Sequence, residues 1–110
     1  VQFGFAQWSA DFPDPYDALA LNLVSSATSN AGLWQNNSFD QLVQQAEQSY
    51  GPARFALYGQ AEQAAINDVG LLPLDHQALA AIIPSTVHGV SLNPMGLYFG
   101  DWSNVYLLSR

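Results

Sequence analysis

The stretch "SFDQLVQQAEQSYGPARFALYGQAEQAAIND", residues 38–68, decides the fold, because it carries two helical periods in direct succession. Ser38 and Gln41 have the spacing of a capping box, which predicts that a first helix begins here. Apolar side chains then recur on one side of that helix, as an amphipathic helix requires. The members of this expected stripe are Phe39, Leu42, Val43, Ala46 and Tyr50.

A second helix should follow at once, because Gly51 can end the first helix and Pro52 can begin the next. We expect it over about residues 52–68, with three alanines, Ala61, Ala64 and Ala65, that allow close packing. The side chains expected near one face are Phe55, Tyr58, Glu62, Ala65 and Ile66. Glu62 is interpreted as an edge position with its head in water, and the two helices should form a helical hairpin.

Upstream of this pair the chain reads as a strand, a short helix and a loop. Residues 1–8, "VQFGFAQW", alternate with a period of two, which predicts a strand that ends near Trp8. In "DPYDALALNL", Asp14 fits an N-cap, Pro15 the first helical position and Asp17 the third, so we expect a helix over residues 15–22. The polar residues 25–37 are expected to form a loop.

Downstream of Gly70 the period changes to that of short strands. "LLPLDHQ" (71–77) and "LAAIIP" (79–84) are read as two strands, the first placed at an edge by its proline. Residues 85–96 should be turns around one short strand, and "SNVYLLS" (103–109) a last strand. The order of strand, helices and strands predicts an α/β fold in one unit, residues 1–110, and the opening strand suggests a piece of a longer protein.

The composition excludes several classes of function. The 110 residues carry a net charge of −7, with only Arg54 and Arg110 as formal cations and no lysine. Nucleic acids and anionic membrane surfaces both need clusters of Lys and Arg, so neither is expected as a partner. The absence of cysteine excludes disulfides, thiolate metal sites and cysteine nucleophiles. No apolar run reaches the ~18 residues of a membrane span.

An acidic cluster, Asp11, Asp14 and Asp17, stands out in this weakly charged chain. Pro13 and Pro15 disfavour helical geometry before them, so the three carboxylates should not share a helix face. Helix capping accounts for Asp14 and Asp17, but it does not account for Asp11. A metal site or a hydrolytic carboxylate pair built from the three acids is the alternative interpretation.

Other chemistry-bearing residues give weaker signals. Asp75 with His76, and His88, lack the spacing of a metal site or a catalytic dyad and are interpreted as a polar strand end and a turn residue. Ser9 has no nucleophile-elbow context. Four aromatic residues are candidates for lining a pocket, with core packing as the alternative for Trp8; they are Trp8, Phe12, Tyr16 and Trp34. Phe39, Phe55 and Tyr58 are expected in the core.

Four stretches in sequence carry a family resemblance: "WSADFPDP" (8–15), "NNSFDQLVQQAE" (36–47), "ARFALYGQAEQAAINDVGLLPL" (53–74) and "VHGVSLNPMG…SNVYL" (87–107). In this order they resemble the C-terminal part of the extracellular solute-binding proteins of peptide ABC transporters. The resemblance covers essentially the whole chain. It implies the C-terminal portion of lobe II of a type II periplasmic-binding-protein-like fold, with a mixed sheet and packed helices, in a protein whose two lobes close on a ligand.

The resemblance also implies a site. In oligopeptide-binding members, the acid of the W-x-A-D motif pairs with the α-amino group of the bound peptide, and Asp11 occupies that position. Trp8, Ser9 and Ala10 resemble the strand edge that hydrogen-bonds peptide backbone, and Phe12 completes the expected substrate-binding residues. Such strand augmentation ignores side-chain identity and permits broad substrates.

As for activity and partners, the resemblance implies a binding protein without catalysis, cofactor or metal, on the extracellular side of a bacterial cytoplasmic membrane. A peptide ligand and the permease of the transporter are the expected partners. Because members of the family also bind nickel complexes, haem or sugars, a different cargo stays open. A homo-oligomer through exposed apolar surface is a further possibility.

Overall fold

The computed structural model describes residues 4–76, 78, 80–91, 93, 95 and 100–108. The internal contacts divide the chain into two units, one that ends at Leu74 and one that begins at Asp75. Within the described residues, no helix has both the length and the apolar character that crossing a membrane requires. That residues 1–110 form one structural unit stays a prediction.

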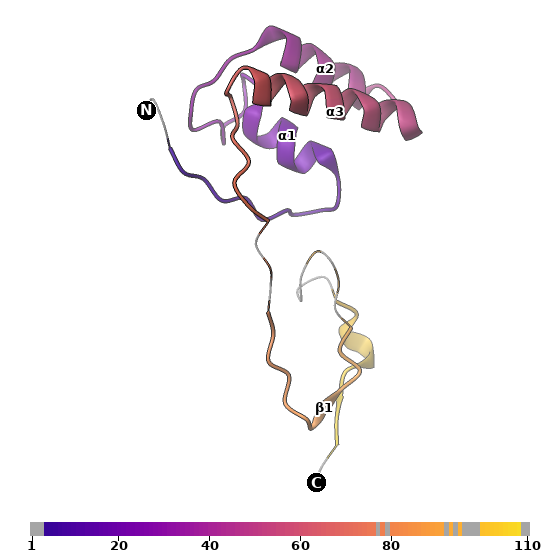
Figure 1. The fold of residues 1–110 in the computed structure, drawn as a ribbon. Helices are drawn as coiled ribbons and strands as arrows, with labels where there is room; N and C mark the ends of the chain where they lie inside the picture. Colours follow the sequence, from indigo (N-terminus) through magenta and orange to yellow (C-terminus); the bar gives the residue numbers. More distant parts are fainter. Residues whose placement is uncertain are drawn as a thin grey trace. The chain divides into compact units, whose positions relative to one another are not determined.

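The first unit contains three helices in its described residues, α1 (Pro15–Leu23), α2 (Asn37–Glu47) and α3 (Gly51–Asn67) (Figure 1). α2 packs along α3, and α1 lies against both helices. The predicted helical hairpin of residues 38–68 is therefore confirmed, as is the short helix after Asp14.

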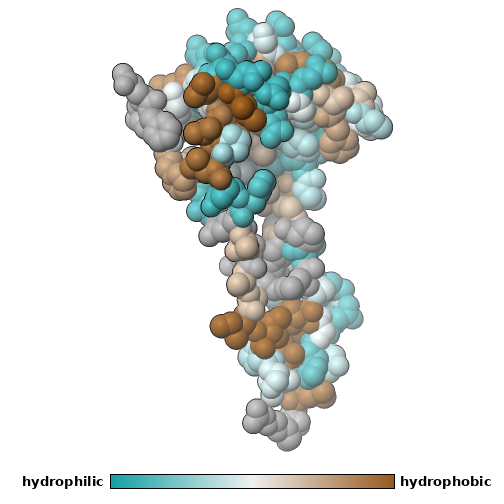
Figure 2. All heavy atoms as spheres, viewed as in Figure 1, coloured by the Kyte–Doolittle hydropathy of each residue, from teal (hydrophilic) through white to brown (hydrophobic). Residues whose placement is uncertain are grey.

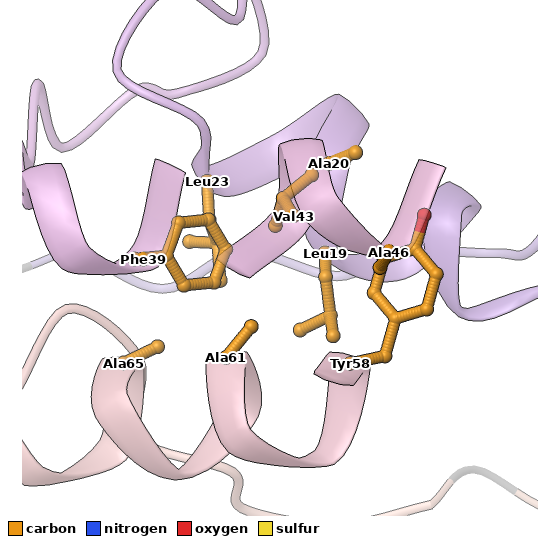
Figure 3. Packing of buried hydrophobic residues seen from close by; sticks show 9 residues of the cluster. All are labelled: Leu19, Ala20, Leu23, Phe39, Val43, Ala46, Tyr58, Ala61 and Ala65. Atoms are coloured by element: carbon orange, nitrogen blue, oxygen red, sulfur yellow. The ribbon is translucent and has the colours of Figure 1, made fainter. Parts of the chain in front are cut away.

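The core of this unit lies where the three helices meet, and each helix contributes three residues to it (Figure 3). Phe39 and Ala61 are fully buried, and Tyr58 is 2% exposed. The alanines of α3 let α2 approach closely, as their pattern predicts. The complete set is Leu19, Ala20, Leu23, Phe39, Val43, Ala46, Tyr58, Ala61 and Ala65.

Two residues predicted to face the core are exposed. Phe55 is 57% exposed, because the buried positions 58, 61 and 65 set the inner line of α3 and Phe55 lies roughly a quarter turn away from it. Arg54 continues that line instead and is partly buried. Tyr50 is 88% exposed because α2 ends at Glu47, before the expected stripe is complete.

The helix caps differ in part from the predicted ones. Asp14 is the N-cap of α1, as expected, and its Oδ1 accepts a 2.8 Å hydrogen bond from the Tyr16 amide. The N-cap of α2 is Asn36 and not Ser38, since the Phe39 amide donates to the side-chain oxygen of Asn36 at 3.0 Å. Gly51, with φ +61°, begins α3 and does not end α2.

The predicted loop between α1 and α2 is confirmed, and a buried amide organises it. Asn30 is 6% exposed, and its side-chain nitrogen donates to the carbonyl oxygen of Trp34 at 2.7 Å. Its side-chain oxygen accepts from the Trp34 amide at 3.1 Å. One side chain thus supplies the backbone partners that a strand or helix would otherwise provide.

The second unit contains a two-stranded antiparallel ladder. β1 (Val87–His88) pairs with β2 (Tyr106–Leu107), with Val87 opposite Leu107 and His88 opposite Tyr106. The 3₁₀ helix η2 (Trp102–Asn104) precedes β2 and is capped by Asp101, whose carboxylate accepts from the Ser103 amide at 3.0 Å. The short strand expected within residues 85–96 is confirmed, whereas the strand predicted over residues 103–109 is found, among the described residues, only at Tyr106–Leu107, because residues 103 and 104 belong to η2.

The other predicted strands are not found in the described residues. Residues 4–8, 71–76, 78 and 80–84 form no strand, while residues 1–3, Gln77 and Leu79 lie outside the described residues. A strand needs a neighbour to accept its hydrogen bonds, and these segments have none among the described residues. Helix and strand are both present, as predicted, but the described β-structure is a two-stranded ladder and not a mixed sheet.

Apolar side chains remain on the surface of each unit (Figure 2). Leu72 and Leu74 are 58% and 65% exposed in the first unit, and Ile82 is 100% exposed in the second. Most of the exposed large apolar residues lie in the segments where strands were predicted. These segments therefore have the apolar composition of buried strands, but their side chains are exposed.

Candidate functional site

The structure assigns a different task to each acid of the cluster. Asp14 forms an ion pair with Arg54 of α3, in which two guanidinium nitrogens each lie 2.7 Å from a carboxylate oxygen. This hydrogen bonding with Arg54, with a further contribution from the Tyr16 amide, lowers the pKa of Asp14 below its ordinary value of 3.8. Asp14 is therefore fully engaged as a cap and an ion-pair partner.

Arg54 connects two of the motifs that carry the resemblance. Its guanidinium carbon lies 4.8 Å from the ring centroid of Tyr58, a cation–π arrangement, while its nitrogens hold Asp14. Burial raises the pKa of Tyr58, and the hydrogen bond to Asp14 raises that of Arg54. This cluster was not predicted from the sequence, although the four-residue spacing of Arg54 and Tyr58 on a helix could have indicated it.

Asp17 is the buried acid of the cluster, with no exposed surface. Its Oδ2 accepts a 2.6 Å hydrogen bond from the indole Nε1 of Trp8, and the backbone amide of Asp11 lies 3.3 Å from both carboxylate oxygens. The prediction of Asp17 as only a first-turn acid is thus incomplete. It also holds the segment that precedes the helix.

Asp11 is exposed, and within the described part of the chain its carboxylate makes no hydrogen bond or ion pair. Its position follows from its backbone amide, which Asp17 binds. Of the three acids, Asp11 is accordingly the one whose charge no structural role uses. This exposed carboxylate is the functional group of the candidate site.

The other predicted site residues surround Asp11 in the chain and are accessible. Trp8 and Phe12 are 44% and 40% exposed, and Ser9 and Ala10 are exposed as well. No backbone hydrogen bond of Trp8, Ser9 or Ala10 to another described residue is found. The segment runs as irregular chain before α1 (Figure 1). Its backbone groups are therefore available to a partner.

The four candidate pocket aromatics do not come together. The Phe12 and Tyr16 rings stack with centroids 6.4 Å apart, whereas Trp34 packs edge-on against Phe39 and donates its indole N–H to Asp68 at 3.0 Å. A shallow hollow of about 440 Å³ beside α1 includes Tyr16 but not Trp8, Phe12 or Trp34. Its lining consists of Tyr16, Ala20, Leu21, Val24, Ser26, Ala27, Thr28 and Glu47.

The described residues do not show the ligand cluster that the alternative interpretation as a metal site requires. Among them, no three His, Asp or Glu side chains gather as ligands of a metal ion. His88 stacks on Tyr106 across the ladder, with ring centroids 5.5 Å apart, and His76 is exposed at the start of the second unit. Within the acidic cluster, the carboxylates of Asp14 and Asp17 have hydrogen-bond partners, whereas the carboxylate of Asp11 has none among the described residues.

Comparison with known proteins finds two relatives that match most of the chain. No protein-family model and no solved structure matches it. The chain is 27% identical over 104 residues to the dipeptide-binding protein DppE of Bacillus subtilis, a match that covers 94% of the chain and 19% of DppE. It is 33% identical over 87 residues to the probable deoxycholate-binding periplasmic protein YgiS of Escherichia coli, covering 78% of the chain and 16% of YgiS.

Both curated relatives are named as binding proteins, and the chain spans about a fifth or less of the length of each. The match to DppE takes in nearly the whole chain. It therefore includes the "WSADFPDP" segment and the two long helices, α2 and α3. The resemblance read from the sequence is thereby confirmed, in that the chain is similar to a part of each of these two bacterial binding proteins.

Proposed function

We propose that this chain forms part of the ligand-binding lobe of an extracellular solute-binding protein, and that it contributes the carboxylate that receives the free amino group of a peptide. The observation that carries the proposal is the isolation of Asp11. Asp14 and Asp17 are occupied by Arg54 and by Trp8, whereas the Asp11 carboxylate is exposed and unpaired among the described residues.

The chemistry of this arrangement suits an ammonium group. An ammonium ion donates to a carboxylate in a charge-assisted hydrogen bond, and the attraction strengthens when water is excluded. The exposed backbone of Ser9 and Ala10 lies directly before Asp11 and has hydrogen-bonding groups to offer to a peptide backbone. The net charge of −7 also favours a positively charged group over an anionic one.

In this proposal the chain belongs to the C-terminal portion of lobe II, and it binds without catalysing a reaction. The exposed apolar segments 71–76 and 80–84 would be covered by other parts of such a lobe. The protein would capture its ligand on the extracellular side of the cytoplasmic membrane and deliver it to the permease of an ABC transporter. The similarity to DppE, named as a dipeptide-binding protein, supports this cargo.

A second candidate is a bile-acid-like cargo, which the similarity to YgiS, named for deoxycholate, favours. Deoxycholate is an amphipathic anion, so an exposed aspartate would repel its charged end and could contact only its hydroxyl groups. The two cargoes therefore make opposite demands on Asp11. Replacement of Asp11 by Asn should weaken peptide binding but leave deoxycholate binding unchanged or stronger.

The test is a calorimetric titration of the protein that carries this chain, in the natural form and as Asp11→Asn. The probes are tri-alanine, N-acetyl-tri-alanine and deoxycholate. We expect tri-alanine to bind about tenfold or more tightly than its acetylated form, and Asp11→Asn to remove that preference. Asp40→Asn is the matched control, because it neutralises another carboxylate of the same unit. Equal binding of the two peptides to the natural protein would refute the assignment.

A further inference from the structure

The segment that carries the candidate site is hydrogen-bonded to the helical core through the carboxylate of Asp17. Asp17 is fully buried in the first turn of α1, and its carboxylate receives the Trp8 indole N–H at 2.6 Å. The same carboxylate receives the backbone amide of Asp11 at 3.3 Å. These hydrogen bonds cross six and nine residues of chain that contain no helix or strand before Asp14.

Asp17 is itself held in place by the core. Leu19, Ala20 and Leu23 of the same helix pack against α2 and α3, as Figure 3 shows, so α1 cannot move without disturbing the buried cluster. Asp14, the N-cap, is tied to α3 by Arg54. The first turn of α1 is therefore fixed at both its cap and its buried face.

A carboxylate suits this task better than its neutral isosteres. It only accepts hydrogen bonds, and it can accept from several N–H groups at once, whereas Asn would place its own N–H₂ against one of them. Both partners of Asp17 are donors, an indole nitrogen and a backbone amide. The position of Asp11 thus depends on the charge and the two oxygens of Asp17.

We infer that Asp17 is a positioning residue, which sets where the Asp11 carboxylate stands and so determines the preference of the site for a free amino group. The inference rests on the proposed function of Asp11. Asp17 does not touch the ligand. It acts by fixing the Trp8 side chain and the Asp11 backbone relative to α1.

The first measurement needs no ligand. In a ¹H–¹⁵N correlation spectrum of the labelled protein, Trp8→Phe identifies the indole resonance of Trp8 by its loss. Asp17→Asn should shift that resonance and the Asp11 amide, while the indole resonances of Trp34 and Trp102 stay in place. Asp40→Asn is the control, because Asp40 also accepts a backbone amide, that of Ser25 at 3.0 Å. An unchanged Trp8 indole in Asp17→Asn would overturn the inference.

The second measurement is the ratio of the dissociation constants of N-acetyl-tri-alanine and tri-alanine. Asp17→Asn should reduce the natural ratio by about tenfold, as expected for the loss of one charge-assisted hydrogen bond, whereas Asp40→Asn should preserve it. A mere loss of stability would lower the occupancy of both peptides together and leave the ratio unchanged. An unchanged ratio in Asp17→Asn would therefore overturn the inference about Asp17, while the proposed function of Asp11 would stand.

Trp8→Phe gives an independent arm if Asp17→Asn unfolds the protein, because it deletes the indole N–H donor while it keeps an aromatic ring at position 8 and leaves Asp17 in place. It should also lower the ratio of the two dissociation constants, by a smaller factor than Asp17→Asn. An unchanged ratio in Trp8→Phe would contradict the inference. A natural protein that does not distinguish the two peptides would refute the proposed function and with it the role of Asp17 in binding. The spectra would still show separately whether Asp17 holds Trp8.

Discussion

The guanidinium of Arg54 donates two hydrogen bonds of 2.7 Å to the carboxylate of Asp14, which lies 40 residues earlier in the sequence. This ion pair joins the start of α1 to the first turns of α3. Both side chains keep part of their surface in water, 21% for Arg54 and 30% for Asp14. Its effect on stability should therefore be modest, but it should depend on pH in a defined direction.

We predict that Asp14→Asn destabilises the first unit at neutral pH and has much less effect in strong acid. Asn caps helices as well as Asp, so the substitution removes mainly the ion pair. Because the folded-state pKa of Asp14 is lowered, its stabilisation is complete above the ordinary value of 3.8 and is lost as the pH falls through the depressed pKa.

Urea unfolding at neutral and acidic pH, followed by circular dichroism, measures this difference. A double-mutant cycle with Arg54→Gln assigns it to the pair. Equal destabilisation by Asp14→Asn at both pH values would show that the ion pair does not contribute to stability.

The core predicts a sharp contrast between two phenylalanines. Phe39 is fully buried, so Phe39→Ala should lower the free energy of unfolding by about 3–5 kcal/mol through lost burial and a cavity. Phe55 is 57% exposed, so Phe55→Ala, the matched control, should cost about 0.5 kcal/mol or less. Thermal denaturation of both variants checks the contrast, and similar losses would mean that the inner face of α3 is wrongly assigned.

The loop before α2 should depend on Asn30. Asn30→Ala would leave the partly buried amide and carbonyl of Trp34 without their side-chain partner, which should cost about 1–3 kcal/mol. Asn37 is exposed at the start of α2, and Asn37→Ala serves as the control with little expected effect. Hydrogen exchange of the Trp34 amide gives a local readout, and unchanged protection in Asn30→Ala would contradict the assignment.

Two glycines should respond to alanine in opposite directions. Gly89 has φ +80°, and a Cβ at this position would overlap the carbonyl oxygen of Asn104, so Gly89→Ala should disrupt the β1–β2 ladder. Gly59 lies inside α3 with open space around it, so Gly59→Ala should stabilise the helix by about 0.5–1 kcal/mol.

Cross-strand nuclear Overhauser effects between His88 and Tyr106 report on the ladder. If these Overhauser effects persist in Gly89→Ala, the backbone of Gly89 does not lie as close to the carbonyl oxygen of Asn104 as the structure shows. Unfolding monitored at α3 reports separately on Gly59→Ala, where a loss of stability would indicate that this face of the helix is covered.

The sequence by itself determined the helices, because their signals are local. A cap, a proline at the first turn and a period of 3.6 residues act within a few residues, and Asp14 with Pro15 places the start of α1 correctly. The same local motifs, in order, also indicated the relation to solute-binding proteins. The position of Asp11 as the acid without a capping role followed from Pro13 and Pro15, which lie between Asp11 and the body of the helix.

Only the tertiary structure decided which residues are buried and which acid is hydrogen-bonded to the segment around Asp11. Arg54 and not Phe55 follows the inner line of α3, because the packing of α2 selects that line. Within the part of the chain that the structure describes, the apolar segments 71–76 and 80–84 have no strand partners, since strand formation depends on a neighbour that sequence periodicity does not reveal. Asp17 became the support of Trp8 and Asp11 because folding places both donors against a buried carboxylate, a contact that no local spacing encodes.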